Sequence, residues 1–357
     1  MVVAVQYRRL PLKLNVMEQM YGIDLGLSSF EVSFFDVQGK LHQLKQVRNT
    51  VEGIGHFLSL LPPDACLCAE YTGLYGDLLL HLCNYAGVRI CFVPGYEIKH
   101  SLGLQRGKSD EVDACRIREY AERFSDRLQT CFAPTEELEE LQELYRTRGQ
   151  LVESRKRLST LNKGDNCKVM VSLVAARARQ HLLDELDEQI RGLDAEIERL
   201  IKSNSEQEKS YRILTSIPGV GPITACELII KTENFQKLDT AKRCAAYAGI
   251  APYPKESGKM KCNNHSSPLG DKHLKSLLFL CARSAKDHNK EILLYFIQKY
   301  QIEKKPYYLV MNNVANKLLR ILYSLIHKGE LYDRDYIQID PRNNQEIRKE
   351  EKAKWAS

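Results

Sequence analysis

The chain has 357 residues, more than one hydrophobic core usually organises, so two domains, or two with a helical connector, are expected. Hydrophobic residues (43%) and charged residues (27%) occur in the proportions of a soluble globular protein, and the net charge of +6 permits a polyanionic partner without requiring one. No apolar run approaches the roughly 20 residues of a membrane span and no signal peptide precedes the first strand, which argues against a membrane partner and favours a cytoplasmic protein.

Residues 1–17 have no hydrophobic pattern, and we expect a flexible arm there, followed by an α/β domain over residues 18–130. The expected strands and helices of this domain lie at 21–26, 31–37 and 41–47, then 50–61 (helix), 65–70, 74–85 (helix) and 88–93. Three early strands followed by strand–helix alternation predict a mixed sheet flanked by helices, of the ribonuclease-H type. No Gly-x-Gly-x-x-Gly turn follows the first strand, which weakens a dinucleotide-binding alternative. Cysteines inside apolar runs, such as Cys66, Cys68, Cys83 and Cys91, are expected to be reduced core residues.

Residues 131–208 are rich in Glu, Leu, Arg and Gln and predict a helical coiled-coil arm. A seam with alternating spacings of three and four is formed by Leu183, Leu186, Ile190, Leu193, Ile197 and Leu200. On the preceding segment a leucine recurs every seven residues, at Leu144, Leu151 and Leu158, and residues 162–166 break the pattern. We expect an antiparallel helical hairpin, which serves either as a structural spacer or as an oligomer contact.

Residues 209–332 predict a mostly helical domain with Gly and Pro between the helices, and its last helix is expected over residues 308–327. The charged residues 333–357 predict a disordered tail. The expected fold class is therefore α/β plus α: an N-terminal ribonuclease-H-like mixed sheet with helices, a central coiled-coil arm and a C-terminal helical domain.

Four carboxylates lie at the ends of predicted elements of the first domain. Asp24 ends the first strand, Glu70 ends the fourth, and Asp110 and Asp113 open a helix and share one of its faces. Neighbouring strand ends lie close together, so Asp24 and Glu70 are expected to converge. Such carboxylates repel one another unless cations lie among them, and two Mg²⁺ ions about 4 Å apart would hold the attacking and leaving oxygens of a phosphodiester. For each acid alone, a helix cap or a solvated surface charge is the plainer interpretation.

The segment 214–225 has the form of a helix-hairpin-helix, with Pro-Gly-Val-Gly between two apolar helices. Gly219, Val220 and Gly221 would form a tight turn whose backbone N–H groups hold a DNA phosphate without reading a base. A plain helix–helix turn is the alternative.

A lysine-rich loop follows, and its residues Lys255, Lys259 and Lys261 predict a surface for a DNA backbone. Ser257 lies among these lysines, before a glycine. A serine there is usually a turn residue, and no neighbouring histidine base is evident, so the residues alone do not identify it as a nucleophile.

These motifs together resemble the DEDD insertion-sequence transposases of the Piv/MooV group, from residue 21 to about residue 331. The resemblance is carried by residues 21–24, 69–73, 108–114, 217–221 and 246–252, and by Ser257-Gly258. It implies a RuvC-like domain whose Asp24, Glu70, Asp110 and Asp113 bind Mg²⁺, for which Mn²⁺ could substitute. It also implies a transposase domain in which Ser257 attacks DNA to form a phosphoserine link.

The same resemblance implies partners. These are donor and target DNA, a structured non-coding guide RNA, and a homodimer or homotetramer built through the helical arm, in the bacterial cytoplasm near the nucleoid. Two departures from the family pattern concern the sites. Tyr71 stands where relatives often have Ala, and Glu256 directly precedes Ser257 where they tend to carry a longer Gly/Ser run, so Ser266 and Ser267 are rivals for the nucleophile.

Three alternatives stay open at this stage. A junction-resolving endonuclease of the RuvC type would need the four acids and metal-assisted hydrolysis but no serine. A related DNA invertase would use the same residues on a different DNA arrangement. A non-enzymatic DNA-binding protein would need the hairpin and the lysines but not the carboxylates.

Overall fold

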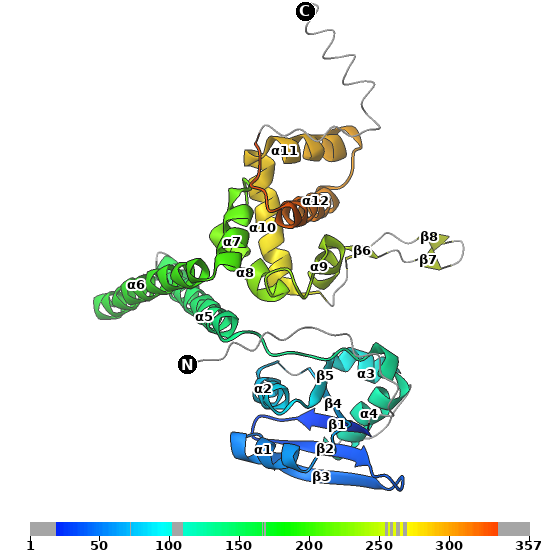
Figure 1. The fold of residues 1–357 in the computed structure, drawn as a ribbon. Coiled ribbons are helices and arrows are strands. Elements are labelled where there is room, and N and C mark those ends of the chain that lie inside the picture. Colours follow the sequence, from blue (N-terminus) through cyan, green and yellow to red (C-terminus); the bar gives the residue numbers. More distant parts are fainter. Residues whose placement is uncertain are drawn as a thin grey trace, which may run out of the picture. The chain divides into compact units, whose positions relative to one another are not determined.

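The computed structural model describes residues 19–71, 73–101, 110–165, 167, 169–253, 256–257, 260–261, 265–266 and 270–334. The side chains of Leu74 and Asp110, and those of the strand residues between 252 and 266, are outside this description. The chain divides into two compact units, one ending at Ala133 and the other beginning at Pro134, and each is described separately (Figure 1). No helix among the described residues is long and apolar enough to cross a membrane.

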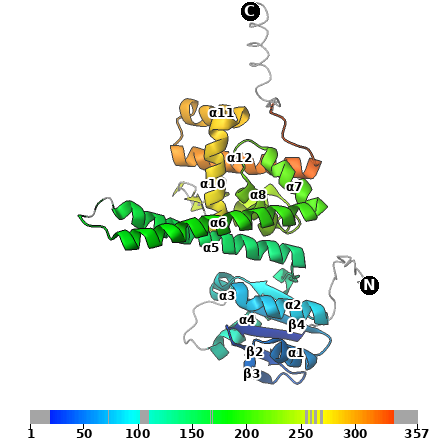
Figure 2. The same cartoon turned by 90° about the vertical axis from the view of Figure 1, so that its left-hand side faces the viewer.

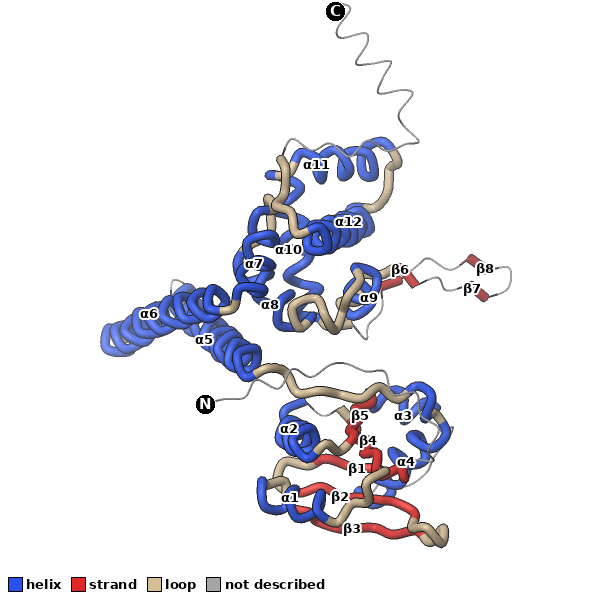
Figure 3. The backbone as a smooth tube through the Cα atoms, viewed as in Figure 1, coloured by secondary structure: helices blue, strands red, loops and turns tan. Residues whose placement is uncertain are grey.

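The first unit is built on a five-stranded mixed sheet. In chain order its strands are β1 (Gln19–Leu25), β2 (Ser29–Phe35), β3 (Leu41–Arg48), β4 (Ala65–Glu70) and β5 (Arg89–Val93). They lie side by side in the order β3-β2-β1-β4-β5 (Figure 3). The first three strands pair antiparallel as a meander, whereas β4 and β5 pair parallel to β1 and to each other. The predicted mixed sheet is confirmed.

Helices cover both faces of this sheet. They are α1 (Val51–Ser59), η1 (Gly73–Gly76), α2 (Asp77–Ala86), α3 (Gly95–Ser101), α4 (Asp110–Arg123) and η2 (Ser125–Arg127). Odd-numbered residues of β1 and β4, such as Ile23 and Ala69, join a core with α1 and α2. Even-numbered residues of β4, such as Cys66 and Cys68, join a second core with α3 and α4. Successive side chains of a strand point to opposite faces. The odd-numbered residues of β1 and β4 therefore face α1 and α2, and the even-numbered residues face α3 and α4.

Helix α4 lies against β1 at Gly22. A Cβ atom on Gly22 would collide with the backbone of Ala114 and Arg118 on α4, so only glycine permits this approach. The expected core cysteines of the first unit, Cys66, Cys68, Cys83 and Cys91, are buried and form no disulfide bond.

The second unit is almost entirely helical. Its helices are α5 (Glu136–Asp165), α6 (Leu173–Ser203), α7 (Ser205–Ser216), α8 (Pro222–Thr232), α9 (Ala241–Tyr247), α10 (Lys272–His288), α11 (Lys290–Ile297), the π-helical turn η3 (Gln298–Ile302) and α12 (Tyr307–Lys328). Four short strands, β6 (Pro252–Tyr253), β7 (Glu256–Ser257), β8 (Met260–Lys261) and β9 (His265–Ser266), pair as β6–β9 and β7–β8. The predicted final helix over 308–327 is confirmed by α12.

Helices α5 and α6 form the predicted antiparallel hairpin (Figure 2). Three ion pairs link them: Arg148 with Asp194, Arg155 with Asp187 and Asp165 with Arg179. The residue numbers of these partners increase along α5 and decrease along α6, so the two helices are antiparallel. The pattern break expected at 162–166 does not end α5, which continues to Asp165. Arg179 explains the difference, because its guanidinium donates to both Asn162 and Asp165 and holds the last turn of α5.

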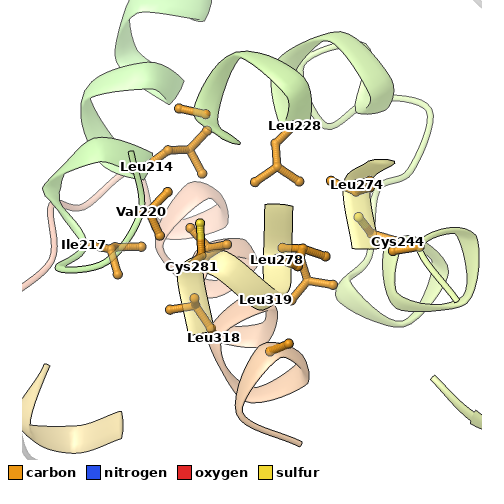
Figure 4. Close-up of a cluster of buried hydrophobic side chains, with 14 of the residues drawn as sticks. Leu214, Ile217, Val220, Leu228, Cys244, Leu274, Leu278, Cys281, Leu318 and Leu319 are labelled. Atoms are coloured by element: carbon orange, nitrogen blue, oxygen red, sulfur yellow. The ribbon is translucent and has the colours of Figure 1, made fainter. Parts of the chain in front are cut away.

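The core of the second unit is shared by α7, α8, α9, α10 and α12. Figure 4 shows side chains from these helices directed toward one another, among them Leu214, Val220, Leu228, Cys281 and Leu318. The turn between α7 and α8 contributes to this core through Val220, which is buried. Gly219 has a left-handed backbone (φ 101°), and a Cβ there would lie 2.5 Å from the backbone nitrogen of Ala285 on α10.

We expect Gly219→Ala to lower the free energy of unfolding by about 2 kcal/mol or more, because it combines a left-handed backbone with overpacking against α10. Gly221→Ala is the matched control. Gly221 has a β-region backbone (φ −93°) and nothing lies within 4 Å of an added Cβ, so its stability should change by less than about 0.5 kcal/mol. Urea unfolding of both variants checks this, and equal losses of stability would refute it.

Candidate functional site

Asp24 and Glu70 lie side by side at the carboxyl ends of two parallel strands. Ile23 of β1 pairs with Ala69 of β4, so Asp24 and Glu70 each follow one residue later in the same register. Ile23 and Ala69 point into the core under α1 and α2, and therefore Asp24 and Glu70 point to the face that α4 covers. Adjacent strands are about 4.8 Å apart, which makes these two carboxylates neighbours.

Helix α4 begins over this end of the sheet. Glu111, near its start, pairs with Lys45 on β3, and Arg118, two turns later, lies with its guanidinium 4.0 Å from the ring centre of Phe35 at the end of β2. The helix therefore runs from the Asp24 end of β1 toward its start, crossing at Gly22. This direction places the first turn of α4, with Asp113, toward Asp24. Asp110 is the first residue of α4, and its side chain is not among those described.

Asp113 already has a cationic partner within its own helix. Its Oδ1 accepts a hydrogen bond from Arg116 Nη1 at 2.8 Å, and both side chains are about three-quarters buried or more, with exposures of 26% and 20%. The carboxylate of Glu70 lies against Gly95 at the start of α3, where a Cβ would collide with it. Gly95 therefore leaves room for Glu70 to turn toward this edge of the sheet.

Glu31 is a further carboxylate at this edge, and the sequence reading did not single it out. It pairs directly with Asp24 across the antiparallel β1–β2 ladder, and opposite residues of such a pair point to the same face. Its neighbours Phe30 and Val32 are buried on the other face, in the core with α1. The signal that could have located Glu31 is the tight turn at 26–29, which sets the register of the two strands.

These carboxylates fit a hard divalent cation by their chemistry. All donors are carboxylate oxygens, the ligands that Mg²⁺ prefers, and Asp24, Glu31 and Glu70 lie on adjacent strands on one face of the sheet. Among the described side chains, no three histidine, cysteine, aspartate or glutamate residues are grouped closely enough to hold a metal ion as they stand. The strand carboxylates thus share the α4 face without being grouped as a metal site in this structure, and Asp113 is engaged by Arg116.

The hairpin between α7 and α8 is tied into the core. Cys281 on α10 accepts a hydrogen bond from the backbone N–H of Gly221, and its Sγ lies 3.2 Å from Thr224 Oγ1. Burial raises the pKa of the Cys281 thiol, and these two contacts oppose that rise. Gly219 faces α10 and Val220 is buried, so much of this turn packs against the rest of the helical unit. A phosphate-holding role for residues 219–221 stays a prediction.

The candidate serine lies in a short two-stranded sheet. Ser257 in β7 pairs with Met260 of β8, and Lys261 pairs with Glu256. The backbone of these residues is described but their side chains are not, and Lys255, Lys259 and Ser267 lie outside the described residues. Ser266 belongs to β9, where it pairs with Pro252. Their assignment as nucleophile and DNA contacts stays a prediction.

A buried polar cluster lies in the helical unit where this segment departs and returns. Glu227 on α8 is 2% exposed and is hydrogen-bonded to Tyr145 of α5. The Tyr145 hydroxyl lies 3.4 Å from Nε2 of His273, and Lys231 Nζ lies 3.1 Å from Oδ2 of Asp271. Burial raises the pKa of Glu227, Lys231 and His273 oppose the rise, and Asp271 adds to it.

The ends of the serine-bearing segment are held by backbone contacts beside this cluster. Asp271 donates its N–H to the Tyr247 carbonyl at 2.8 Å and accepts from the Tyr247 hydroxyl at 3.3 Å. Gly270 and Gly249 touch backbone to backbone, since a Cβ on Gly270 would collide with Gly249. Asn312 on α12 donates to the Ile250 carbonyl at 2.9 Å. The sequence reading missed this anchoring cluster, because its members are spread over four helices.

Two family models match the chain. A DEDD transposase model of the IS110 type, described as "Transposase", matches residues 21–163. A second, described as "Transposase IS116/IS110/IS902 family", matches residues 211–296.

Relatives match over different lengths. The transposase for insertion sequence element IS1328 of Yersinia enterocolitica is 24% identical over 88% of this chain and 98% of its own length. The pilin gene-inverting protein of Moraxella bovis is 26% identical over 75% of this chain and 82% of its own. An uncharacterised 43.6 kDa protein of insertion element IS110 from Streptomyces coelicolor is 28% identical over 42% of this chain. The matched region covers only 36% of that protein's own length. Among solved structures, Thermus thermophilus RuvC is 16% identical, covers 32% of this chain and 99% of its own, and has a TM-score of 0.24.

The raised pKa of Glu227 gives a stability prediction. A carboxyl whose pKa is raised by folding favours the folded state at low pH, and this contribution is lost as the pH rises through the folded-state pKa. Glu227→Gln removes the buried charge, so above that pH it should be more stable than the wild type by about 1 kcal/mol. Below about pH 4 the two should be equally stable.

Glu188→Gln, an exposed position on α6, is the matched control and should follow the wild type at every pH. Urea unfolding between pH 4 and 8 measures all three proteins. A Glu227→Gln variant that loses stability at pH 8 would show that the charged form of Glu227 is held favourably.

Proposed function

This chain belongs to the IS110/IS116/IS902 family of DEDD transposases, and from that membership we propose that it cuts and rejoins DNA strands, using the Mg²⁺-binding carboxylates of its first unit and Ser257 of its second as the nucleophile. The observation that carries the proposal is the common face of Asp24 and Glu70, at adjacent strand ends beneath the start of α4. An arrangement of oxygen donors at one edge of a sheet suits phosphodiester chemistry more than it suits binding alone.

Asp24, Glu70, Asp110 and Asp113 are the proposed ligands of two Mg²⁺ ions, with Mn²⁺ as a substitute. When bound, these ions would neutralise the carboxylates and supply Lewis acidity at the scissile phosphate. The chain itself contributes orientation. The β1–β4 register aligns Asp24 with Glu70. Helix α4, packed on Gly22, would bring Asp110 and Asp113 toward the same edge. Before metal binding, Arg116 offsets the charge of Asp113.

Ser257 is the proposed nucleophile. Its Oγ would form a bond to the phosphorus as the bond to one DNA oxygen breaks, and the serine proton would pass to that leaving oxygen. One phosphodiester is exchanged for one phosphoserine ester, so a DNA hydroxyl can reverse the step without an external energy source. Lys255, Lys259 and Lys261 would offset the phosphate charge, and residues 219–221 would contact the backbone of the DNA. The anchoring of residues 247–251 and 270–271 supports a serine-bearing segment held at both ends.

Donor and target DNA are the proposed substrates, and a structured non-coding RNA is the proposed guide. The α5–α6 arm is proposed to join two or four copies of the chain. Exposed apolar side chains at its turn support this role, since large apolar patches mark interaction sites. They are Val169, Met170, Leu173 and Val174.

Asp24→Asn should reduce strand cleavage more than about a hundredfold, because losing even an outer partner of a metal ligand costs roughly 10–100-fold. The fold should persist, since the two side chains have nearly equal volume. Asp64→Asn, an exposed aspartate just before β4 at the opposite edge of the sheet, is the control and should cleave normally. Cleavage of labelled DNA carrying the ends of the chain's own element, in Mg²⁺, measures both. Full activity of Asp24→Asn would remove it from the site.

Ser257→Ala should bind DNA but give no covalent protein–DNA adduct and no joined product. Ser266→Ala, in the neighbouring ladder, should still give the adduct. Denaturing electrophoresis of labelled DNA after reaction distinguishes the cases. An adduct with Ser257→Ala would move the nucleophile to Ser266 or Ser267. Nicked DNA without any adduct from the wild type would instead favour the metal-dependent junction-resolving endonuclease.

A further inference from the structure

Aromatic rings and lysines gather where α11 passes through η3 into α12, just beyond the part of the chain that the second family model matches. Phe296 and Tyr300 stack with ring centres 5.2 Å apart and planes inclined by 27°. Tyr307 meets Tyr300 edge-on at 5.9 Å, and Tyr308 continues the series 5.7 Å from Tyr307. Four rings thus form one connected row, of which only Phe296 is buried.

The outer rings of this row are open to solvent. Tyr300 is 41% exposed, Tyr307 40% and Tyr308 81%, although burial of such rings normally stabilises a protein. Tyr300 uses one face on Phe296, and it lines a hollow of about 520 Å³ together with Gln301, Lys304 and Lys305. This hollow is an open depression of the surface rather than an enclosed pocket.

The charge at this place is positive. Lys299 and Lys305 share one carboxylate, Glu303, with distances of 2.6 Å to its two oxygens. Lys304 adds a third ammonium group from an exposed residue with a left-handed backbone (φ 54°). Three lysines against one glutamate leave an excess of positive charge on the rim of the hollow.

We propose that Tyr300, Tyr307 and Tyr308, with Lys299, Lys304 and Lys305, form a platform that binds an unpaired DNA strand. Bases stack on the tyrosine rings and the lysines neutralise the phosphates between them. Every base has a flat face, so such binding tolerates any sequence. A duplex hides its base faces within its own stack and offers only phosphates to the platform. A family that cuts and rejoins DNA must handle opened strands, which makes single-stranded DNA the occupant that the charge and the rings favour.

Fluorescence anisotropy with the full chain tests this proposal, using a fluorescein-labelled 15-nucleotide DNA strand of mixed sequence, its duplex, and the RNA strand of the same sequence. Tyr300→Leu and Tyr308→Leu should each weaken single-strand binding about 5-fold or more. Duplex binding should stay nearly unchanged. Tyr308→Trp should bind the strand at least as tightly as the wild type, because the larger ring stacks better. Tyr85→Leu, an exposed tyrosine of α2 outside this row of rings, is the control and should have no effect.

The lysines have a separate readout in the salt dependence of binding. Lys304→Gln with Lys305→Gln should make the slope of log K against log salt less negative by about 0.7 for each lysine that contacts a phosphate. Lys40→Gln, on the β2–β3 turn, should leave the slope unchanged. Wild-type affinity for the single strand in the doubly substituted Tyr300→Leu, Tyr308→Leu chain would overturn the proposal. If the tyrosine variants lost equal affinity for the strand and for the duplex, the platform would be only a general phosphate contact and base stacking would be excluded. Tighter, tyrosine-dependent binding of the RNA strand would overturn the assignment to DNA.

Discussion

The candidate metal site depends on one backbone contact, the approach of α4 to β1 at Gly22. Strand pairing alone brings Asp24 and Glu70 together, but Asp113 belongs to a separate helix and needs a close crossing to reach the same edge. Glycine allows the carbonyl of Ala114 and the amide of Arg118 to lie directly on the strand. Contacts farther along α4, from Glu111 to Lys45 and from Arg118 to Phe35, then set its direction across the sheet. The carboxylates are held by rigid elements, as a site that must orient a phosphodiester requires.

The second unit holds the two ends of the segment that contains Ser257. These ends are held by backbone contacts at Gly249 and Gly270 and by Asp271, which bonds both Tyr247 and Lys231. Glu227 is buried beneath them. Burial disfavours its charged form, and the nearby charges of Lys231 and His273 offset this desolvation only in part. Polar groups in this position favour a defined geometry over maximal stability, which agrees with a role in supporting the serine-bearing segment.

Local patterns were sufficient to predict the fold class, the sheet of the first unit and the last helix of the second. The strands expected at 21–26, 31–37, 41–47, 65–70 and 88–93 and the heptad seam of α6 all correspond to elements of the structure. Contacts between distant segments were not predictable in this way. Glu31 joins the acidic edge only through strand register, and the residues around Glu227 come from α5, α8 and the start of α10. Helix α5 persists to Asp165 because Arg179 from α6 binds its end. The tyrosine–lysine platform likewise requires the turn through η3.

We propose that Asp24 and Glu70, together with the start of α4, hold a divalent cation. Anomalous diffraction from crystals of the full chain grown with Mn²⁺ tests it most directly. The predicted result is a peak about 2 Å from carboxylate oxygens of both Asp24 and Glu70, with Asp113 released from Arg116. Crystals whose protein cleaves DNA in Mn²⁺ but whose only peaks lie away from this edge of the sheet would contradict the claim.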